Sequence, residues 1–505
     1  WPIWAKPARS SSPATASADL RATGFVLAGS AITGCSRAPV RTATPLPTQP
    51  EDFWPGRSEQ YATICTACPA SCGVLAKVRD GRPVKLEGNP DHPVSRGGLC
   101  AVGQASILSL YDSHRLGQPQ AAGKPASWEE TDRAILTALD SIRKQKGAVR
   151  ILTGTVTSPS LQERIRAFAA TFENARHVVF DPLSSSAILD AHEDLFGTRV
   201  LPRMRFEKAP VVAAFEADFL GTWISPAEFT RGYREARLEN GKPSAHAWHT
   251  HFESHLSLTG GGAEERVRLA PGHIAHALAA LVSRLASRAG AKPPALTAPA
   301  GVLPEKELDA LAARLWNARG RSLVVCGLAD VKAQKLCAYA NQLLGNYGTT
   351  LDLERPSMQR QGSDRAMAGL LQEISAGQVA ALFVHGLNPV AELPLDKPAL
   401  DALRRIPLLV SLSSRADETA ELARFVCPDA DPLESWGDAE PVSGTVCIQQ
   451  PVFRQVGHSR PAMESLAAWS GKPATTRDQV RAYWRDSIHP RHGGGQPFEE
   501  FWRAS

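Results

Sequence analysis

The 505-residue sequence lacks long apolar runs, has few cysteines and carries almost no excess charge. No stretch reaches the ~20 consecutive apolar residues that a membrane-spanning helix needs. The 56 basic and 51 acidic residues leave a net charge of +5, without the basic cluster typical of nucleic-acid binding. Nine cysteines are too few, and an odd number, for a disulfide-stapled scaffold. The GxGxxG and GxxxxGK[ST] phosphate loops are also missing, so a simple nucleotide enzyme is not supported.

The first 58 residues are predicted to be a leader and a linker. In "LRATGFVLAGSAITGC" an arginine precedes a short run of small apolar residues that ends at Cys35. This ending is similar to a bacterial lipobox, which makes Cys35 a candidate for lipidation. The alternative is an apolar segment that packs on a partner chain. Residues 36–58 are rich in Pro, Thr and Ser and predict an extended linker.

Four of the nine cysteines gather in a unit predicted at residues 59–118. Their spacing is C-x2-C-x3-C-x27-C, formed by Cys65, Cys68, Cys72 and Cys100. Three thiolates on a short loop, with a fourth delivered by a predicted hairpin that turns at Asp80-Gly81, can surround a [4Fe–4S] cube, because each iron takes one cysteine sulfur. A zinc site, which favours two C-x2-C pairs, and buried thiols without a metal are the alternatives. The remaining cysteines after the leader are expected to be core thiols: Cys326, Cys337, Cys427 and Cys447.

The rest of the chain alternates between strand-like and helix-like segments. Apolar strands are predicted within residues 148–154, 209–223, 321–327 and 378–394. Strand-then-helix units build parallel sheets, so the fold class is α/β: a small iron–sulfur domain followed by two doubly wound, Rossmann-like lobes at 119–300 and 301–460. Residues 461–505 form a C-terminal extension. Ligands are expected at the carboxyl ends of the strands, namely at Thr153-Gly154, Asp218, Cys326-Gly327 and Asn388-Pro389.

Several of these segments together resemble the molybdopterin oxidoreductases. The cysteine loop, "EGNPDHPVSRGGLC" and "SLYDSHRL" resemble the family's N-terminal unit, and "ALFVHGLNP" with "ETAELARFVCPDADPLESWGDAEP" resembles its later α/β region. Within the family, "RILTGTVTSPSL" and "VSLSSRADETAELA" are most similar to the molybdopterin-like iron–sulfur subunit of bacterial alternative complex III, a membrane assembly that oxidises quinol. The resemblance implies one [4Fe–4S] cluster on the four cysteines, serving electron relay or structural support.

Departures from the family pattern imply that molybdopterin is absent. Catalytic members bind the metal through Cys, selenocysteine, Ser or Asp, but "VFDPLSSSAILDAHEDLFG" offers only Ser184, Ser185 and Ser186. The family's lysine two residues after the fourth cysteine is Val102 here, and its "PGTD" segment reads "PGHI", with Ile274 in place of the acid. The family's C-terminal barrel is also expected to be absent. We therefore expect that this chain is not itself the catalytic site.

The resemblance also implies partners and a location. The partners would be a ferredoxin-like multi-cluster subunit, an integral-membrane quinol-binding subunit and c-type cytochrome subunits. The terminal "FEEFWRAS" resembles the point at which the family's chain continues into a ferredoxin-like portion. The chain would lie on the periplasmic face of a bacterial inner membrane. Two alternatives stay open: a catalytic molybdopterin oxidoreductase acting on a sulfur or arsenic oxyanion, and a zinc-stabilised interaction scaffold.

Two other sets of polar residues could serve a site. "HAWHTHFESH", from His246 to His255, contains four histidines but no H-E-x-x-H signature, so a surface or partner contact is expected. If this segment is helical, His251 and His255 share a face. Carboxylates at predicted strand ends are expected to accept backbone N–H groups: Asp218, Asp417 and Glu434.

Overall fold

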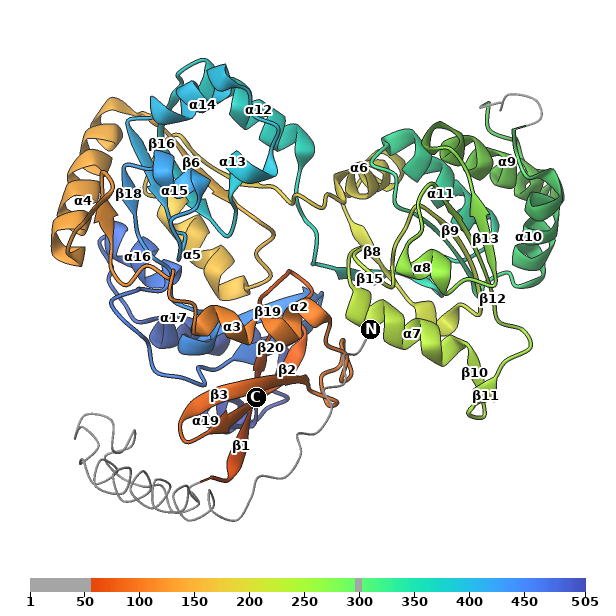
Figure 1. Cartoon of the computed structure of the whole chain (residues 1–505), viewed down its shortest axis with the longest axis horizontal. Coiled ribbons are helices and arrows are strands. Elements are labelled where there is room, and N and C mark those ends of the chain that lie inside the picture. The colour runs from red at the N-terminus through yellow and green to blue at the C-terminus, as the bar shows by residue number, and fades with distance from the viewer. Residues whose placement is uncertain (1–55, 296–301) are drawn as a thin grey trace, which may run out of the picture. The chain divides into compact units, whose positions relative to one another are not determined.

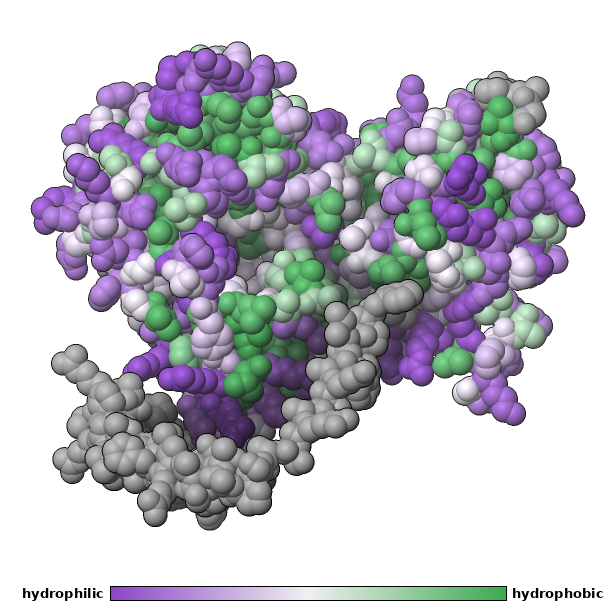
Figure 2. All heavy atoms as spheres, in the orientation of Figure 1, coloured by the Kyte–Doolittle hydropathy of each residue, from purple (hydrophilic) through white to green (hydrophobic). Residues whose placement is uncertain are grey.

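The computed structural model describes residues 56–295 and 302–505 (Figure 1). The predicted leader with Cys35, and nearly all of the linker, lie outside these residues. Within the described ranges, no helix combines the length and the apolar character needed to cross a membrane. Polar side chains predominate on the face shown in Figure 2, with apolar side chains scattered among them.

The cysteine-bearing unit is built on a three-stranded sheet with the order β1-β2-β3. Its strands are β1 (Ser58–Ile64), β2 (Gly73–Arg79) and β3 (Arg82–Gly88), and the short helices α2 (Ala101–Ala105) and α3 (Ile107–Leu110) contact β3. Asp80 and Gly81 both have positive φ, 50° and 73°. A two-residue hairpin turn of this kind requires positive φ at both central residues, so the predicted hairpin is confirmed.

A seven-stranded sheet has the order β5-β4-β18-β17-β16-β6-β7. The pairs from β18 to β7 are parallel and β4 is antiparallel to β18. The strands are β4 (Gln120–Ala121), β5 (Lys124–Pro125), β6 (Ala148–Thr153), β7 (Ala175–Val179), β16 (Val379–His385), β17 (Leu408–Ser411) and β18 (Phe425–Val426).

Helices cover both faces of this sheet. One core contains side chains of α4 (Trp128–Gln145), α5 (Pro159–Ala169) and α16 (Ala462–Trp469). The other contains side chains of α12 (Asp364–Ser375), α14 (Lys397–Arg404) and α15 (Glu418–Leu422). α13 (Pro389–Glu392) follows β16 and contacts α15.

A second, four-stranded parallel sheet has the order β13-β12-β9-β14. Its strands are β9 (Val211–Phe215), β12 (Trp248–Glu253), β13 (Glu265–Arg268) and β14 (Ser322–Cys326). One face packs on α9 (Pro271–Ala289), α10 (Glu305–Asn317) and α11 (Val331–Leu343), and the other on α6 (Ser186–Phe196) and α7 (Pro226–Ala236). Both sheets are therefore covered on two faces, as predicted for doubly wound units.

The remaining elements are smaller. A four-stranded sheet joins β8 (Leu201–Met204), β15 (Leu351–Ser357), β19 (Gly437–Val442) and β20 (Thr445–Gln449) by antiparallel pairing. A short hairpin joins β10 (Leu238–Glu239) and β11 (Lys242–Pro243), followed after β12 by α8 (Leu258–Gly261). The chain continues through η2 (Phe206–Lys208), η3 (Pro432–Glu434), α17 (Thr476–Tyr483), η4 (Trp484–Ile488), α18 (His489–His492) and α19 (Phe498–Ala504).

The two α/β sheets are not consecutive along the chain. In one sheet β6 pairs with β16, with Leu152 opposite Val384, and in the other β9 pairs with β14, with Phe215 opposite Cys326. Each sheet thus combines strands from both sides of the boundary that the sequence predicts near residue 300. The sequential split into 119–300 and 301–460 does not describe the sheets, because a strand-then-helix pattern is local and does not specify which strands pair. The described residues form no closed barrel.

Candidate functional site

The structure brings the four cysteines of the motif together. Cys65, Cys68 and Cys72 lie on the loop between β1 and β2, and Cys100 is the N-cap of α2. The loop is closed by the Cys65 N–H, which donates to the Cys72 carbonyl at 2.8 Å. At the helix start, the Gly103 N–H donates to Cys100 Sγ at 3.4 Å. Cys65 and Cys72 are buried, whereas Cys100 is exposed, so the site reaches from the core of the unit to its surface.

Burial and mutual repulsion both disfavour the ionised form of the buried thiols in this group. Burial raises the pKa of Cys65 and Cys72, and the negative charges of the other thiolates raise both further. Four thiolates in such a place would repel one another unless positive charge lies among them. An iron–sulfur cluster supplies that charge and spreads its four thiolate ligands over four irons. In the part of the chain that the structure describes, no three His, Cys, Asp or Glu side chains converge as ligands of a single ion would.

Gly103 lies where α2 approaches the cysteine loop closely. A Cβ at this position would lie 2.4 Å from Leu99 Cδ1 and 3.3 Å from Cys65 Sγ. A larger residue would therefore displace the Leu99 side chain and press on the loop at Cys65.

The other four described cysteines lie outside this group. Cys326, Cys337 and Cys427 are buried core thiols, as predicted. Cys447 is half-buried and lies 3.3 Å from His92 Nε2. Because His92 Nδ1 accepts the Ser95 N–H at 3.1 Å, Nε2 carries the proton and donates to Cys447 Sγ.

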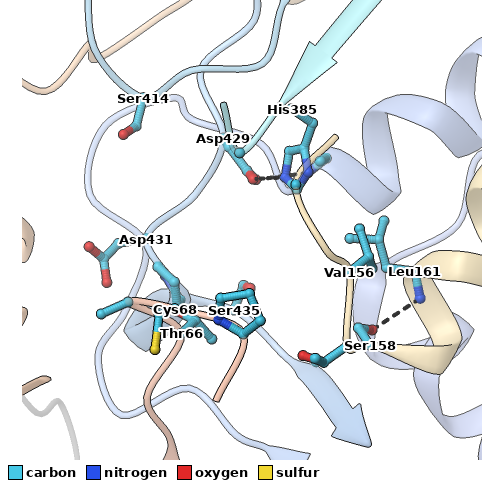
Figure 3. Close-up of a pocket in the computed structure, with 18 of the residues that line it drawn as sticks. Thr66, Cys68, Val156, Ser158, Leu161, His385, Ser414, Asp429, Asp431 and Ser435 are labelled. Carbon is cyan, nitrogen blue, oxygen red and sulfur yellow. Dashed lines mark hydrogen bonds and ion pairs between the residues drawn. The ribbon is translucent and has the colours of Figure 1, made fainter. Parts of the chain in front are cut away.

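A cavity of about 720 Å³ opens beside the cysteine loop. Cys65 and Cys68 form part of its wall, and the residues that follow β6, β16, β17 and β18 form much of the rest. In Figure 3, Thr66 and Cys68 lie across the cavity from His385, Asp429 and Ser158. The cavity therefore lies at the carboxyl ends of parallel strands, where ligands bind in α/β sheets.

Most acidic groups in the cavity wall already accept hydrogen bonds. Asp429 Oδ2 lies 2.9 Å from His385 Nε2, and Asp181 accepts the backbone N–H groups of Thr155 and Gly362 at 3.0 and 2.9 Å. The lining contains six carboxyl side chains: Asp181, Glu392, Asp417, Asp429, Asp431 and Asp438. It contains three arginines: Arg115, Arg360 and Arg415.

Two of the three arginines in the cavity wall are held in ion pairs. Arg115 is paired with Glu434 at 2.7 Å and Arg415 with Asp112 at 2.8 Å. Among the described residues Arg360 has no hydrogen-bond or salt-bridge partner, so it is the one lining cation that these residues leave available.

Several of the predicted strand-end residues lie at this cavity. Gly154, Asn388 and Asp417 line it, whereas Asp218 and Cys326 lie at the end of the four-stranded sheet. The predicted role of the three carboxylates as acceptors of backbone N–H groups is confirmed. Asp218 accepts from Thr259 at 3.1 Å, Asp417 from Ala420 at 2.8 Å, and Glu434 from Asp431 at 3.2 Å.

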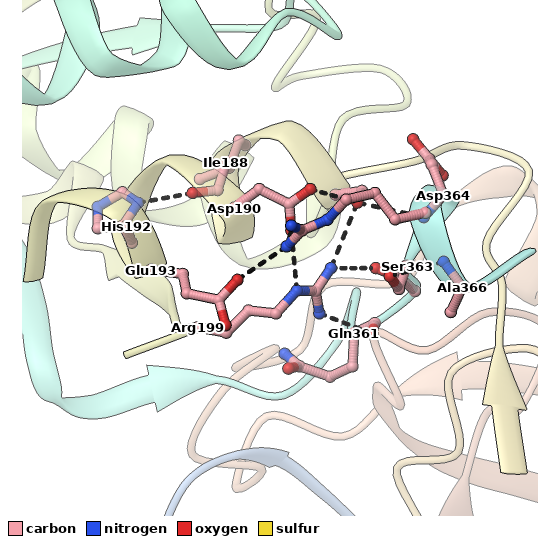
Figure 4. Close-up of polar contacts among 12 residues, drawn as sticks. Ile188, Asp190, His192, Glu193, Arg199, Gln361, Ser363, Asp364 and Ala366 are labelled. Carbon is pink, nitrogen blue, oxygen red and sulfur yellow. Dashed lines mark hydrogen bonds and ion pairs between the residues drawn. The ribbon is translucent and has the colours of Figure 1, made fainter. Parts of the chain in front are cut away.

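The serines weighed as metal ligands do not line the cavity. Ser184 donates to Asp364, and Ser186 donates to Asp190 at 3.2 Å. Asp190 in turn accepts from Arg199, within the polar network shown in Figure 4. Of the positions where the sequence departs from the family, Val102 is 66% exposed on α2 and Ile274 is fully buried in the core beneath α9. Neither position faces the cavity.

The expectation for the histidine-rich stretch is wrong for its central residues. This segment forms β12, and His249 and His251 are buried, 0% and 1% exposed. His249 and His251 share a face because side chains alternate along a strand, and burial lowers the pKa of both. His255, beyond the strand, is exposed. The polar composition of this segment predicts a surface position, but the segment is a central parallel strand, and both of its faces are buried.

Sequence reasoning missed the His385–Asp429 pair. Both residues stand at or just after strand ends, which was the available signal, but they are far apart in the sequence.

Comparisons with known proteins extend these observations. The family model described as Molybdopterin oxidoreductase Fe4S4 domain matches residues 59–112. The chain is 26% identical over 467 residues to the menaquinone reductase, molybdopterin-binding-like subunit, of Nitratidesulfovibrio vulgaris, covering 83% of this chain and 65% of that protein. It is 31% identical over 109 residues to a sulfite dehydrogenase subunit from Allochromatium vinosum, and this match covers 20% of this chain and 11% of that protein. The chain thus spans less than two thirds of the length of these curated relatives.

The fold has a solved counterpart in acetylene hydratase from Pelobacter acetylenicus. The TM-score is 0.63 at 12% identity, and the match covers 81% of this chain and 69% of that chain. This likeness concerns the fold alone. The Fe4S4 domain match at residues 59–112 and the 26% identity over most of the chain confirm the predicted resemblance to molybdopterin oxidoreductases.

Proposed function

We propose that the chain is the iron–sulfur subunit of a membrane quinol:electron-acceptor oxidoreductase of the alternative complex III type, and that it works without molybdenum. The observation that carries this proposal is the pairing of four gathered thiols with a neighbouring cavity that is poor in cations. Cys65, Cys68, Cys72 and Cys100 would hold one [4Fe–4S] cluster. When bound, such a cluster supplies one-electron transfer.

The gradient of burial across the four cysteines supports a relay role. Cys65 and Cys72 are buried, which keeps water away from one side of the site, and exposed Cys100 lies where a partner can approach. The proposed partners are a ferredoxin-like multi-cluster subunit, an integral-membrane quinol-binding subunit and c-type cytochrome subunits, on the periplasmic face of the membrane. Cys35 is the proposed lipid attachment site.

Three features support the absence of molybdenum. The three serines of residues 184–186 lie outside the cavity lining, the lysine position is an exposed valine, and the cavity wall has more carboxyls than arginines. Each removes a group that a bound pterin or its metal would use.

The test uses the native membrane assembly, purified through a tag on this chain. We expect the assembly to oxidise quinol and the Cys68→Ser variant to lose that activity. If the cluster relays electrons, the subunits of the variant should stay together. If the cluster supports the structure, they should separate. Cys447→Ser, which makes the same change at a half-buried thiol outside the motif, is the matched control. A tagged chain that purifies without quinol-oxidising activity contradicts the proposal.

A catalytic molybdopterin oxidoreductase acting on a sulfur or arsenic oxyanion is the second candidate. It is favoured by the 720 Å³ cavity, in whose wall His385 and Asp429 form a hydrogen-bonded pair suited to proton transfer. Stoichiometric molybdenum, together with turnover of a sulfur or arsenic oxyanion by the purified chain, would establish this second function.

A further inference from the structure

The helix that follows Cys100 brings no positive charge to the cysteine site. The residue two positions after Cys100 is Val102, which is 66% exposed and does not line the cavity. α2 therefore contributes no positive charge between the cysteines and the cavity.

Arg360 brings a positive charge to the cavity wall from a distant part of the sequence. It lies between the end of β15 at Ser357 and the start of α12 at Asp364. Its side chain shares the cavity wall with Cys65 and Cys68. Arg115 and Arg415, the other arginines in the wall, are held in ion pairs, whereas the described residues give the Arg360 guanidinium no such partner.

The segment that carries Arg360 is fixed against the seven-stranded sheet. The Gln361 N–H donates to Thr155 Oγ1 at 2.7 Å, and the Gly362 N–H donates to Asp181 Oδ2 at 2.9 Å. Arg199 Nη2 donates to the Gly362 carbonyl at 2.8 Å, in the network drawn in Figure 4. A Cβ at Gly362 would lie 2.7 Å from the Asp181 nitrogen, so this approach requires glycine. The backbone around Arg360 is therefore held by hydrogen bonds that do not depend on the charge of the cysteine site.

We propose that Arg360 is a positioning residue that sets the reduction potential of the cluster held by the four cysteines. The proposal rests on the proposed function, because it needs the cluster to be present. Accepting an electron adds one negative charge to a site that already contains four thiolates. A fixed cation close by stabilises the more negative state and so raises the potential.

Arg360 and Cys68 lie close enough for the charge of the guanidinium to act on the sulfur. A neighbouring cation favours the more negative state of a site, and an added electron makes the cluster more negative.

The test compares Arg360→Gln, which removes the charge, with Arg360→Lys, which keeps it, in the full-length chain purified anaerobically. Arg355→Gln is the control, because Arg355 is exposed, lies five residues earlier on β15 and does not line the cavity. The readout is the midpoint potential from a redox titration followed by electron paramagnetic resonance, with iron content measured on each sample. At a fixed potential, R360Q should lower the ratio of reduced to oxidised cluster about tenfold, which corresponds to a fall in the midpoint potential of about 59 mV for one electron. R360K and R355Q should stay close to wild type.

Two results would overturn the inference. One is an R360Q midpoint equal to that of wild type at equal iron content. The other is an equal fall in R360Q and R360K, because that points to packing and not to charge. Loss of iron from R360Q alone, with R360K intact, supports the need for the charge. Wild-type chain that contains no iron refutes the proposed function itself, which is a distinct outcome.

Discussion

Breaking the buried ion pair between Arg115 and Glu434 should destabilise the protein strongly. Arg115 Nη1 and Nη2 donate to the two carboxylate oxygens of Glu434 at 3.0 and 2.7 Å. The side chains are 11% and 0% exposed, so neither charge is well solvated by water. Arg115→Met keeps much of the apolar stem and leaves the carboxylate without its counter-charge. Loss of one partner of a buried pair costs ~3–5 kcal/mol.

The residual contacts of Glu434 place the expected cost near the lower end of that range. The backbone N–H groups of Asp431 and Val456 still donate to its carboxylate at 3.2 Å each. We therefore expect R115M to lower the free energy of unfolding by about 3 kcal/mol, measured from urea midpoints by far-UV circular dichroism at an unchanged slope.

A matched ion pair supplies the control. Arg415 and Asp112 also join the end of the cysteine-bearing unit to the α/β body, but their side chains are 43% and 28% exposed. Arg415→Gln should cost at most about 1 kcal/mol because exposed pairs are screened by water. Replacing both buried partners, as in R115M/E434M, should recover much of the loss. The reasoning is refuted if R115M costs no more than R415Q.

Two further predictions test the cysteine site and the pH response. Gly103→Ala should lower the iron content of the purified chain, because the added Cβ would overlap Leu99 and press on Cys65 Sγ. Gly369→Ala on α12 is the control and should leave the iron content unchanged, because a Cβ there has nothing within 4 Å. Equal iron in both variants would contradict this prediction. Burial, with the charge of His385, lowers the pKa of His177 from 6.5 to about 4. As the pH falls below 6.5, His177 takes up a proton in the unfolded chain before it does so in the folded protein. The free energy of unfolding therefore decreases, by about 2 kcal/mol at pH 5. His177→Gln should flatten this part of the stability profile in urea titrations between pH 7 and 5, and parallel profiles would count against it.

The sequence predicts best those features that depend on neighbouring residues. The cysteine spacing, the turn at Asp80-Gly81 and the burial of Cys326 all follow from local pattern, and the structure confirms the hairpin and the core thiol. The pairing of β6 with β16 could not be predicted, because strand signals carry no information about partners far along the chain. The placement of Arg360 in the same cavity wall as Cys68 depends on that long-range topology, so no local motif marks it.

The prediction for the histidine-rich stretch was wrong for a related reason. His249 and His251 have polar side chains, and composition alone places such residues on the surface. Their burial is decided by the position of β12 between β9 and β13, which only the assembled sheet defines.

The most direct test of the account is the metal content of the full-length chain, purified without oxygen and measured by elemental mass spectrometry. The account predicts about four irons per chain, with zinc and molybdenum near zero. About one zinc per chain, or molybdenum in stoichiometric amount, would contradict it.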